Sequence, residues 1–167
     1  MQIEYSYPSD GQTVSFTNLS VEVRKIDTFL KFKKVHPDAK LPTKNNASDV
    51  GFDVYSVESK AIPARGSAVV DVGLEFAEIS PDFWVKVEGR SGLGFKYGVS
   101  PHPGIIDPGY RGNAGIKLYN NTDTEYIVEK GDKIAQFVVY RNYNVLVEEG
   151  ETVESDRGAN GFGSSGR

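Results

Sequence analysis

The strongest constraint on this chain is a series of short segments in which apolar and polar residues alternate. In "AVVDVGLEF" (68–76), apolar side chains occupy every second position from Val70 to Phe76. The segment "FWVKVE" repeats this period of two, and "GIKLYN", "EYIVEKGD" and "IAQFVVY" continue it. Glycine, asparagine, aspartate or proline separates the segments, as is typical of turns. Many short strands with frequent turns predict an all-β sandwich, jelly roll or small barrel.

Helices have little support in this sequence. No stretch of 12 residues shows a clean helical stripe, and the best helical candidate is "SGLGFKYG" (91–98). Its glycines are poor helix formers and limit it to a turn or two. In the strand expected at 83–88, Phe83, Val85 and Val87 should share one face of the sheet, because side chains alternate along a strand.

The composition narrows the class of protein. Hydrophobic residues make up 38% of the 167 residues, which is enough for one core, and the net charge of −4 argues against broad binding to nucleic acid or membranes. The absence of cysteine excludes disulfides and cysteine-bound metals. No apolar run reaches the roughly 18 residues of a membrane-spanning helix, and the first residues lack the order of a signal peptide. We therefore expect a soluble protein of the cytoplasm or nucleus.

One domain with an extension at each end is expected from the length. Residues 1–29 are interpreted as an N-terminal extension of unknown role, with one or two strands. Residues 30–150 form the β-rich core, which includes a polar, proline-marked connection at 36–49. Residues 151–167 form a flexible C-terminal arm, first acidic and then rich in glycine, and such a composition cannot bury enough apolar surface to fold alone.

The loop "GVSPHPGIIDPGYRGN" (98–113) is the richest in candidate chemistry. Asp107 follows two apolar residues, Ile105 and Ile106, and precedes a Pro-Gly turn. If the isoleucines anchor the segment, Asp107 is oriented and partly desolvated, which suits a general base for water. The alternative is that Asp107 simply begins a turn, because Asp-Pro-Gly is common turn chemistry.

A second candidate is "EGRSGLGFKYG" (88–98), where a strand should give way to a glycine-rich turn. Arg90, Ser91 and the backbone N–H groups that follow could bind an oxyanion or a phosphate. The alternative is a strand-to-turn junction with a solvated arginine. Gln136 lies within the apolar segment "GDKIAQFVVY", where its amide either bonds to backbone groups or meets a ligand. From this position alone we favour the backbone.

Metal-binding signals are weaker. Asp49 and Asp53 flank Gly51 and could meet a hydrated Mg²⁺, which is often held through few carboxylates together with substrate phosphates. The alternative is a pair of acids at a strand edge on the surface. Only two histidines are present, far apart in sequence, so a multi-histidine zinc site is not expected. The ending "GFGSSG" fits G-x-G-x-x-G, but one residue follows it where a dinucleotide fingerprint requires a helix.

In their order along the chain, these segments resemble the five motifs of the trimeric dUTPase (deoxyuridine triphosphatase) family. The motifs match "DVGFDVYS", "GRSGLG", "GIIDPGYRGN", "GDKIAQFVV" and "RGANGFGSSG", and the resemblance runs from about Leu30 to the C-terminus. It implies a jelly-roll-like β-barrel that assembles as a homotrimer with active sites shared between subunits. It also implies hydrolysis of dUTP to dUMP and pyrophosphate, with Mg²⁺ held mainly by the triphosphate.

The same resemblance assigns roles to individual positions. Asp107 matches the catalytic aspartate that activates the attacking water, and Asp53 matches an acid that reaches the metal through water. Tyr110 matches the ring that packs against the deoxyribose and leaves no room for a 2′-hydroxyl. Arg157 matches a clamp on the γ-phosphate, and Phe162 a ring over the uracil. The other substrate-binding positions are Arg90, Ser91, Gly92, His102, Gly104, Ile106, Gln136, Gly163, Ser164 and Ser165, of which Arg90, Ser91 and Gln136 match phosphate contacts.

Two parts of the chain carry more specific expectations. The arm should close over the substrate as a lid, using ring stacking and an arginine–phosphate pair. The hairpin tip "SPHP" should read uracil through backbone groups. Pro101 and Pro103 have no N–H to donate, which leaves His102 and Gly104 as the donors.

Other interpretations stay open at this point. The related dCTP deaminases share the barrel and a segment similar to "IDPGYRG", although the glycine-rich ending favours the triphosphatase. A dUTP-sensing or partner-binding module on the same scaffold is a further interpretation. Residues 1–29 have no counterpart in the motifs, and a protein partner could bind through them.

Overall fold

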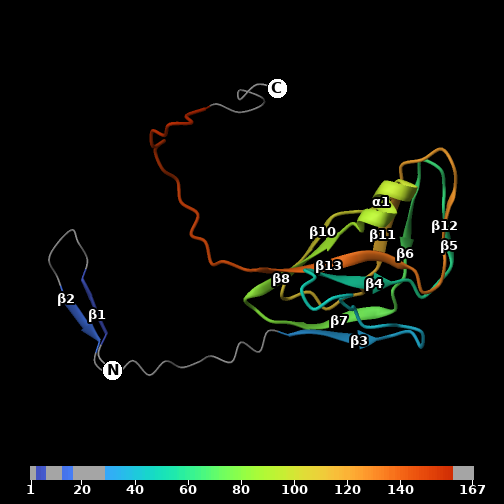
Figure 1. The fold of residues 1–167 in the computed structure, drawn as a ribbon, viewed down its shortest axis with the longest axis horizontal. Helices are drawn as coiled ribbons and strands as arrows, with labels where there is room; N and C mark the ends of the chain where they lie inside the picture. The colour runs from blue at the N-terminus through green and yellow to red at the C-terminus, as the bar shows by residue number, and fades with distance from the viewer. Residues whose placement is uncertain (1–2, 7–12, 17–28, 160–167) are drawn as a thin grey trace.

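The structure is a computed structural model that describes residues 3–6, 13–16 and 29–159. Within these residues it is built almost entirely of short strands, with a single helix (Figure 1). The elements are β1 (Ile3–Ser6), β2 (Thr13–Phe16), β3 (Leu30–Lys34), β4 (Gly51–Tyr55), β5 (Lys60–Ile62), β6 (Ser67–Val70), β7 (Leu74–Ile79), β8 (Phe83–Glu88), α1 (Ser91–Tyr97), β9 (Val99–Pro101), β10 (Gly104–Ile106), β11 (Ile116–Asn120), β12 (Tyr126–Val128) and β13 (Lys133–Arg141). The predicted all-β class is confirmed.

Every strand pair is antiparallel, and most neighbours in the sheets are far apart in sequence. The largest sheet has the order β10-β8-β13-β4, a second has the order β6-β11-β9, and the remaining pairs are β12-β5, β3-β7 and β1-β2. The long strand β13 joins β4 from the start of the core to β8 from its middle. This connectivity matches the expected jelly-roll-like barrel, because both larger sheets are assembled from distant parts of the chain.

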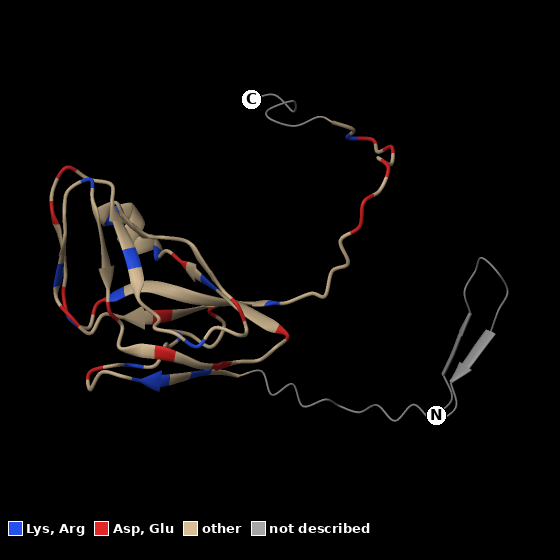
Figure 2. Cartoon of the chain, turned by 180° about the vertical axis from the view of Figure 1, so that it is seen from behind, with Lys and Arg blue, Asp and Glu red and all other residues tan. Residues whose placement is uncertain are grey.

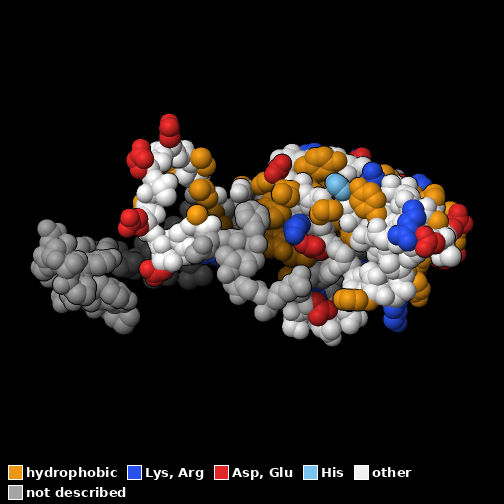
Figure 3. Space-filling view, turned by 90° about the horizontal axis from the view of Figure 1, so that it is seen from above, with side chains coloured by type: hydrophobic (Ala, Val, Ile, Leu, Met, Phe, Trp, Pro, Cys, Tyr) orange, Lys and Arg blue, Asp and Glu red, His pale blue; other side chains and the backbone are white. Residues whose placement is uncertain are grey.

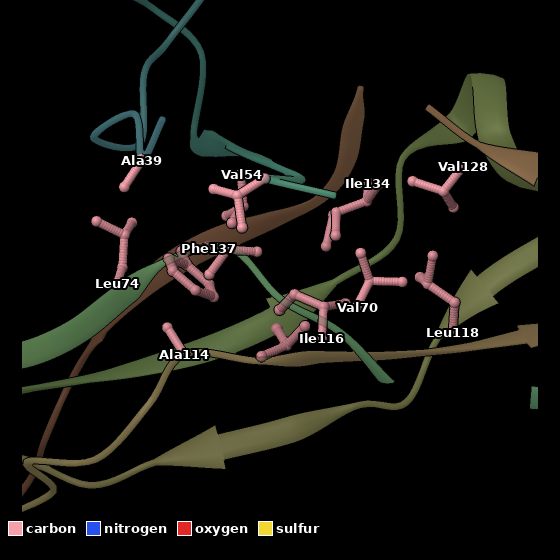
Figure 4. Packing of buried hydrophobic residues seen from close by; sticks show 14 of the residues in the cluster. Ala39, Val54, Val70, Leu74, Ala114, Ile116, Leu118, Val128, Ile134 and Phe137 are labelled. Atoms are coloured by element: carbon pink, nitrogen blue, oxygen red, sulfur yellow. The ribbon is translucent and has the colours of Figure 1, made fainter. Parts of the chain in front are cut away.

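The sheets enclose one hydrophobic core (Figure 4). Nine strands contribute buried side chains to it, and β3 and β10 pack partly buried side chains against it. Its centre is an aromatic cluster in which the ring of Phe76 lies 4.9 Å from that of Phe32 and 5.5 Å from that of Phe137. Phe83, Val85 and Val87 of β8 do point to this side of their sheet, as the alternating pattern predicted. Burial of these side chains is the main favourable term that holds the strands together.

The alternating run "AVVDVGLEF" forms two strands rather than one. β6 ends at Val70 and β7 begins at Leu74, and Gly73 between them has a φ of 65°, which glycine adopts without strain. The Asp71 carboxylate accepts the N–H of Gly73 at 2.8 Å and closes this turn. The alternating positions Val70, Val72, Leu74 and Phe76 are nevertheless all buried in the core, so the pattern correctly predicted their environment.

The single helix is as short as its glycines predicted. α1 has seven residues, of which only Leu93 is buried. Gly98 ends the helix in the left-handed conformation, with a φ of 62°, and its N–H donates to the carbonyl of Gly94 at 3.0 Å. Arg90 and Ser91 therefore lie where strand β8 passes into the first turn of α1.

The outer surface and the C-terminal segment are charged. Lys31 and Lys33 of β3 pair with Glu78 and Glu75 of β7, seen as neighbouring blue and red positions in Figure 2. After β13, residues 142–159 are exposed and form no strand, and Figure 3 shows their acidic and apolar side chains standing clear of the core. No helix among the described residues is long and apolar enough to cross a bilayer.

Candidate active site

All described residues of the predicted site except Arg157 line one of two separate hollows. The first hollow has a volume of about 260 Å³, and its lining includes His102, Gly104, Ile106, Asp107 and Tyr110. The second hollow has a volume of about 400 Å³ and is lined by Asn45, Asp49, Asp53, Arg90, Ser91, Gly92, Lys133 and Gln136. Among the described residues, no side chain lines both hollows.

The two hollows lie on opposite faces of the sheet β10-β8-β13-β4. Gln136 and Phe137 are successive residues of β13, and side chains alternate between the faces of a strand. Gln136 pairs with Asp53 of β4, and both line the second hollow. Phe137 pairs with Val87 of β8, and both line the first hollow. The sheet therefore separates the two groups of site residues within one chain.

Tyr110 is fixed at the first hollow by contacts on several sides. Its ring meets that of Phe76 edge-on at 5.9 Å, which connects the hollow to the aromatic core. Its hydroxyl donates to the carbonyl of Asn113 at 3.0 Å. Gly112 lies beneath the ring, and a Cβ there would come within 2.5 Å of Cζ of Tyr110 and closer still to Oη. The ring is thus held in one orientation at the wall of the hollow.

Asp107 lies at the same wall, but not between two buried isoleucines. In β10 the side chains alternate, so that Ile105 is 69% exposed while Ile106 is partly buried. The expectation that both residues anchor the segment is wrong, and Asp107 is itself exposed in the single chain. Asp107 does begin a turn, since its carbonyl accepts the N–H of Tyr110 at 3.0 Å. The turn places the carboxylate and the Tyr110 ring at one hollow.

The segment "SPHP" is not the tip of a hairpin, because β9 pairs with β11 and β10 pairs with β8 in another sheet. His102 lies in the connection between these two strands and lines the first hollow. Its backbone N–H donates to the carbonyl of Lys117 at 2.7 Å, so the expectation that this group is available to a base is wrong. The cause is the antiparallel pairing of β9 with β11, which continues past Pro101. The His102 side chain remains at the hollow, where its Nδ1 lies 3.2 Å from the hydroxyl of Tyr119.

The second hollow is organised around Asp53, whose side chain is 14% exposed. Arg90 Nε donates to one carboxylate oxygen at 2.9 Å, and Lys133 Nζ donates to the other at 2.7 Å. Arg90 also donates from Nη1 to the carbonyl of Lys133 at 3.1 Å. Arg90 is therefore not a merely solvated arginine, because the carboxylate and the carbonyl fix its guanidinium at the edge of the hollow.

Gln136 bonds to the backbone, as its place in an apolar strand predicted. Its Nε2 donates to the carbonyl of Gly89 at 2.7 Å, across the pair formed by β13 and β8. The amide lies directly over Gly51 of β4, where a Cβ would come 2.7 Å from Cδ of Gln136 and closer still to Oε1. The glycine thus leaves the space in which the amide lies along the wall of the second hollow.

Asp49 and Asp53 do not form a pair of carboxylates. Asp49 accepts the backbone N–H of Asn46 at 2.8 Å and closes the turn that precedes β4. It lines the second hollow, but its hydrogen bonds serve the loop. Of the two acids that flank Gly51, Asp53 is the one that is held by the cations of the site.

Comparison with known proteins identifies the family. The dUTPase family profile matches residues 37–166. A deoxyuridine 5′-triphosphate nucleotidohydrolase from Kluyveromyces lactis is 35% identical over 144 residues, which cover 83% of this chain and 94% of the relative. A protein of the same name from Clostridium acetobutylicum is 43% identical over 140 residues, which cover 82% and 96% of the two chains. This chain belongs to the dUTPase family.

Solved structures agree with this assignment to the dUTPase family. A mutant dUTPase of Staphylococcus bacteriophage 80alpha, described with dUpNHpp, superposes with a TM-score of 0.75 at 27% identity. The match covers 83% of this chain and 98% of the phage protein. Both the barrel and the family inferred from the five motifs are therefore confirmed.

The described part of this dUTPase chain offers no protein cage for a metal ion. It contains no group of three or more histidine, cysteine, aspartate or glutamate side chains that could hold one. Both oxygens of Asp53 accept hydrogen bonds from cations, yet a carboxylate has about four acceptor positions. The remaining acceptor positions of Asp53 fit Mg²⁺ only through a bound water molecule. Phosphates and water would supply the other ligands of the metal.

The last motif of the dUTPase family falls largely outside the described residues. Phe162, Gly163, Ser164 and Ser165 are in this undescribed part, so their expected roles at the uracil and the phosphates stay predictions. Arg157 is described and exposed, and it lines neither hollow. Of the one or two strands expected in the N-terminal extension, β1 and β2 are described, and residues 17–28 lie outside the described residues.

Lys133 is a residue of the second hollow that the sequence did not reveal, as is Asn45. Lys133 stands three positions before Gln136, and on a regular strand an odd separation places two residues on opposite faces. The pairing with β4 shifts register between Lys133 and Ala135, and two successive residues, Ile134 and Ala135, are buried. This bulge brings Lys133 back to the face of Gln136. The adjacent apolar residues Ile134 and Ala135 did not distinguish the bulge in the sequence, because Phe137 and Val138 of the same strand are also adjacent and apolar.

Proposed function

We propose that this chain hydrolyses dUTP to dUMP and pyrophosphate, and that it does so as a homotrimer with Mg²⁺. Membership of the dUTPase family supports the reaction, since the relatives carry the name deoxyuridine 5′-triphosphate nucleotidohydrolase. The match to a phage dUTPase described with dUpNHpp supports a site for a uracil nucleotide with a phosphate chain.

The observation that carries the proposal is the chemistry and placement of the two hollows. The first presents a fixed tyrosine ring and a carboxylate, which suit a nucleoside and an attacking water. The second presents two cations, a hydroxyl and an amide, which suit phosphates. Because the sheet separates them, a nucleotide cannot occupy both hollows of one chain. A complete site then requires the first hollow of one copy beside the second hollow of another, as a symmetric oligomer allows.

At the first hollow, Asp107 acts as the catalytic base. Its carboxylate accepts a hydrogen bond from a water molecule and takes the proton as the water oxygen attacks the α-phosphorus. The bond from the α-phosphorus to the bridging oxygen breaks, and pyrophosphate leaves. The rigid ring of Tyr110 packs against the deoxyribose and excludes a 2′-hydroxyl. Gly104 and Ile106 line the place of the uracil ring.

At the second hollow, positioning and charge neutralisation carry the reaction. Arg90, Ser91, Gly92 and Gln136 contact the phosphates, and Asp53 reaches the metal through water. Mg²⁺, when bound to the triphosphate, neutralises charge on the phosphate chain. Arg157 and Phe162 of the arm then cover the substrate and exclude water from it.

The test is pyrophosphate release from dUTP, dCTP, dTTP and UTP with Mg²⁺. We expect fast release from dUTP alone, loss of release in Asp107→Asn, and a strong reduction in a chain that stops after Asp156. Release from several nucleotides would mean that the connection with two prolines, between β9 and β10, does not select uracil. Conversion of dCTP to dUTP would instead identify a deaminase, and no reaction with any nucleotide would contradict the enzyme assignment.

We also propose that the N-terminal extension, residues 1–29, binds a protein partner. It lies outside the family match, and within the described part of the chain β1 and β2 pair only with each other. An isolated two-stranded hairpin is at best marginally stable in water, which favours a role completed by binding. Removal of residues 1–28 should leave dUTP hydrolysis intact. A loss of folding or activity on this removal would contradict the proposal.

A further inference from the structure

The second hollow contains a cation with unused hydrogen-bonding capacity. Lys133 carries an ammonium group with three N–H donors, and Asp53 accepts one of them at 2.7 Å. No other acceptor for Nζ is found among the described residues. The side chain lines the second hollow and is 33% exposed to solvent. The remaining donors are therefore available to a ligand in that hollow.

The position of this ammonium group is built into the fold. The bulge between Lys133 and Ala135 turns the side chain to the face of Gln136, and Asp53 fixes its end. The same carboxylate holds Arg90 through its other oxygen, and Arg90 in turn bonds to the carbonyl of Lys133. Asp53 thus sets two cations side by side at one wall. Two cations at one wall offer charge-assisted hydrogen bonds to a ligand with several negative charges, such as a polyphosphate.

The charge of Lys133 is secure at neutral pH. The hydrogen bond to Asp53 raises the pKa of the ammonium group above its usual value, and the nearby Asp53 charge acts in the same direction. A cation held in place before the ligand arrives loses little rotamer freedom on binding, which favours affinity.

We propose that Lys133 is a further substrate-binding residue, which donates directly to the polyphosphate of the nucleotide in the second hollow. This inference rests on the proposed function, because it names a new contact within the same site. Lys133 keeps its hydrogen bond to Asp53 through one N–H donor and binds a phosphate oxygen through another. Asp53 is accordingly a positioning residue for two cations as well as a contact for the hydrated metal.

The experiment compares Lys133→Gln with the unaltered full chain by isothermal titration calorimetry. The ligands are a non-hydrolysable imido analogue of dUTP with Mg²⁺, and dUMP, which lacks the outer phosphates. A lost charge-assisted hydrogen bond should weaken the analogue about 10- to 100-fold. The affinity for dUMP should change less than about twofold. Lys133→Arg should keep most of the affinity, because a cation remains.

A matched control is Lys130→Gln, which removes a cation three residues earlier whose partner is Asp38 on the surface. It should leave both affinities unchanged. The contact is separated from an indirect effect by repeating Lys133→Gln in an Asp53→Asn background. If Lys133 binds phosphate directly, the analogue is weakened in this background too.

Three results would overturn the inference: unchanged affinity of Lys133→Gln for the analogue, equal weakening of dUMP and the analogue, or no effect in the Asp53→Asn background. The last would mean that Lys133 only orients Asp53. Failure of the proposed function is distinguishable, since it would appear as absence of dUTP hydrolysis by the unaltered chain. The melting temperatures of all variants show whether each one is folded.

Discussion

Gly51 of β4 lies directly beneath the side-chain amide of Gln136 on β13. The two residues belong to paired strands, and a Cβ on Gly51 would come 2.7 Å from Cδ of Gln136. The amide is held there by its hydrogen bond of 2.7 Å to the carbonyl of Gly89. A backbone position without a side chain thus determines where a proposed phosphate contact lies.

Gly51→Ala should therefore impair the enzyme more than it impairs the fold. The new methyl group displaces the end of a flexible side chain and breaks one hydrogen bond, which costs about 0.5–1.5 kcal/mol of stability. We expect a rise of roughly tenfold in KM for dUTP, similar to that of Gln136→Ala, as measured by steady-state kinetics. Gly94→Ala is the control, because open space surrounds that position. Kinetics like those of the unaltered chain in Gly51→Ala would show that Gln136 does not act from this place.

Gly112→Ala should reduce the discrimination between dUTP and UTP. A Cβ there collides with the Tyr110 ring and would move it from its place against the sugar. We expect the ratio of kcat/KM for dUTP over UTP to fall by about tenfold or more. Tyr110→Phe removes only the hydrogen bond to Asn113 and should keep most of the selectivity. Equal selectivity in Gly112→Ala and the unaltered chain would contradict the role given to the ring.

Leu118→Ala should destabilise the barrel. Leu118 lies in β11 and is completely buried, so its truncation removes apolar burial and leaves a cavity. The expected loss is about 2–5 kcal/mol in the free energy of unfolding, measured by chemical denaturation. Ile127→Ala, at a position that is 45% exposed, should change stability by less than about 0.5 kcal/mol. Similar losses in the two variants would show that β11 does not pack in the core as described.

The ion pair of Arg65 and Asp123 should give stability a small dependence on acid pH. The hydrogen bond from Arg65 lowers the pKa of Asp123 in the folded chain. A carboxylate with a lowered folded-state pKa stabilises the fold above its unfolded pKa of about 3.9, and this stabilisation is lost as the pH falls through the folded-state value. Asp123→Asn should thus lower the melting temperature slightly at pH 7. At a pH below the folded-state pKa of Asp123, it should not change the melting temperature. Glu125→Gln, which removes a neighbouring carboxylate, is the control. A gap between the melting temperatures of Asp123→Asn and the unaltered chain that widens as the pH falls would contradict this prediction.

Much of the fold and of the site was predictable from local sequence. Alternation identified the strands because one face of each is buried, and the glycines of α1 correctly limited its length. Arg90, Asp107, Tyr110 and Gln136 were each found from a short motif, and each one lies at a hollow. These features depend on a few neighbouring residues, which a single sequence records.

Features that depend on pairing between distant strands were not predictable. The outward direction of Ile105 follows from the alignment of β10 on β8, and the hydrogen bond of the His102 N–H follows from the approach of β11. The bulge in β13 that turns Lys133 into the second hollow is likewise a property of its pairing with β4. Each is set by register, which short motifs do not contain.

The division of the site between two faces of one sheet leads to the most direct test. Asp107→Asn disables the first hollow and Arg90→Gln disables the second, and each variant alone should be inactive. The two are mixed in equal amounts, unfolded and refolded together, and dUTP hydrolysis is measured. If each site joins hollows from different copies, random assembly restores about a quarter of the sites and a comparable share of the activity. No recovery, from a mixture that assembles normally, would mean that one chain completes its own site.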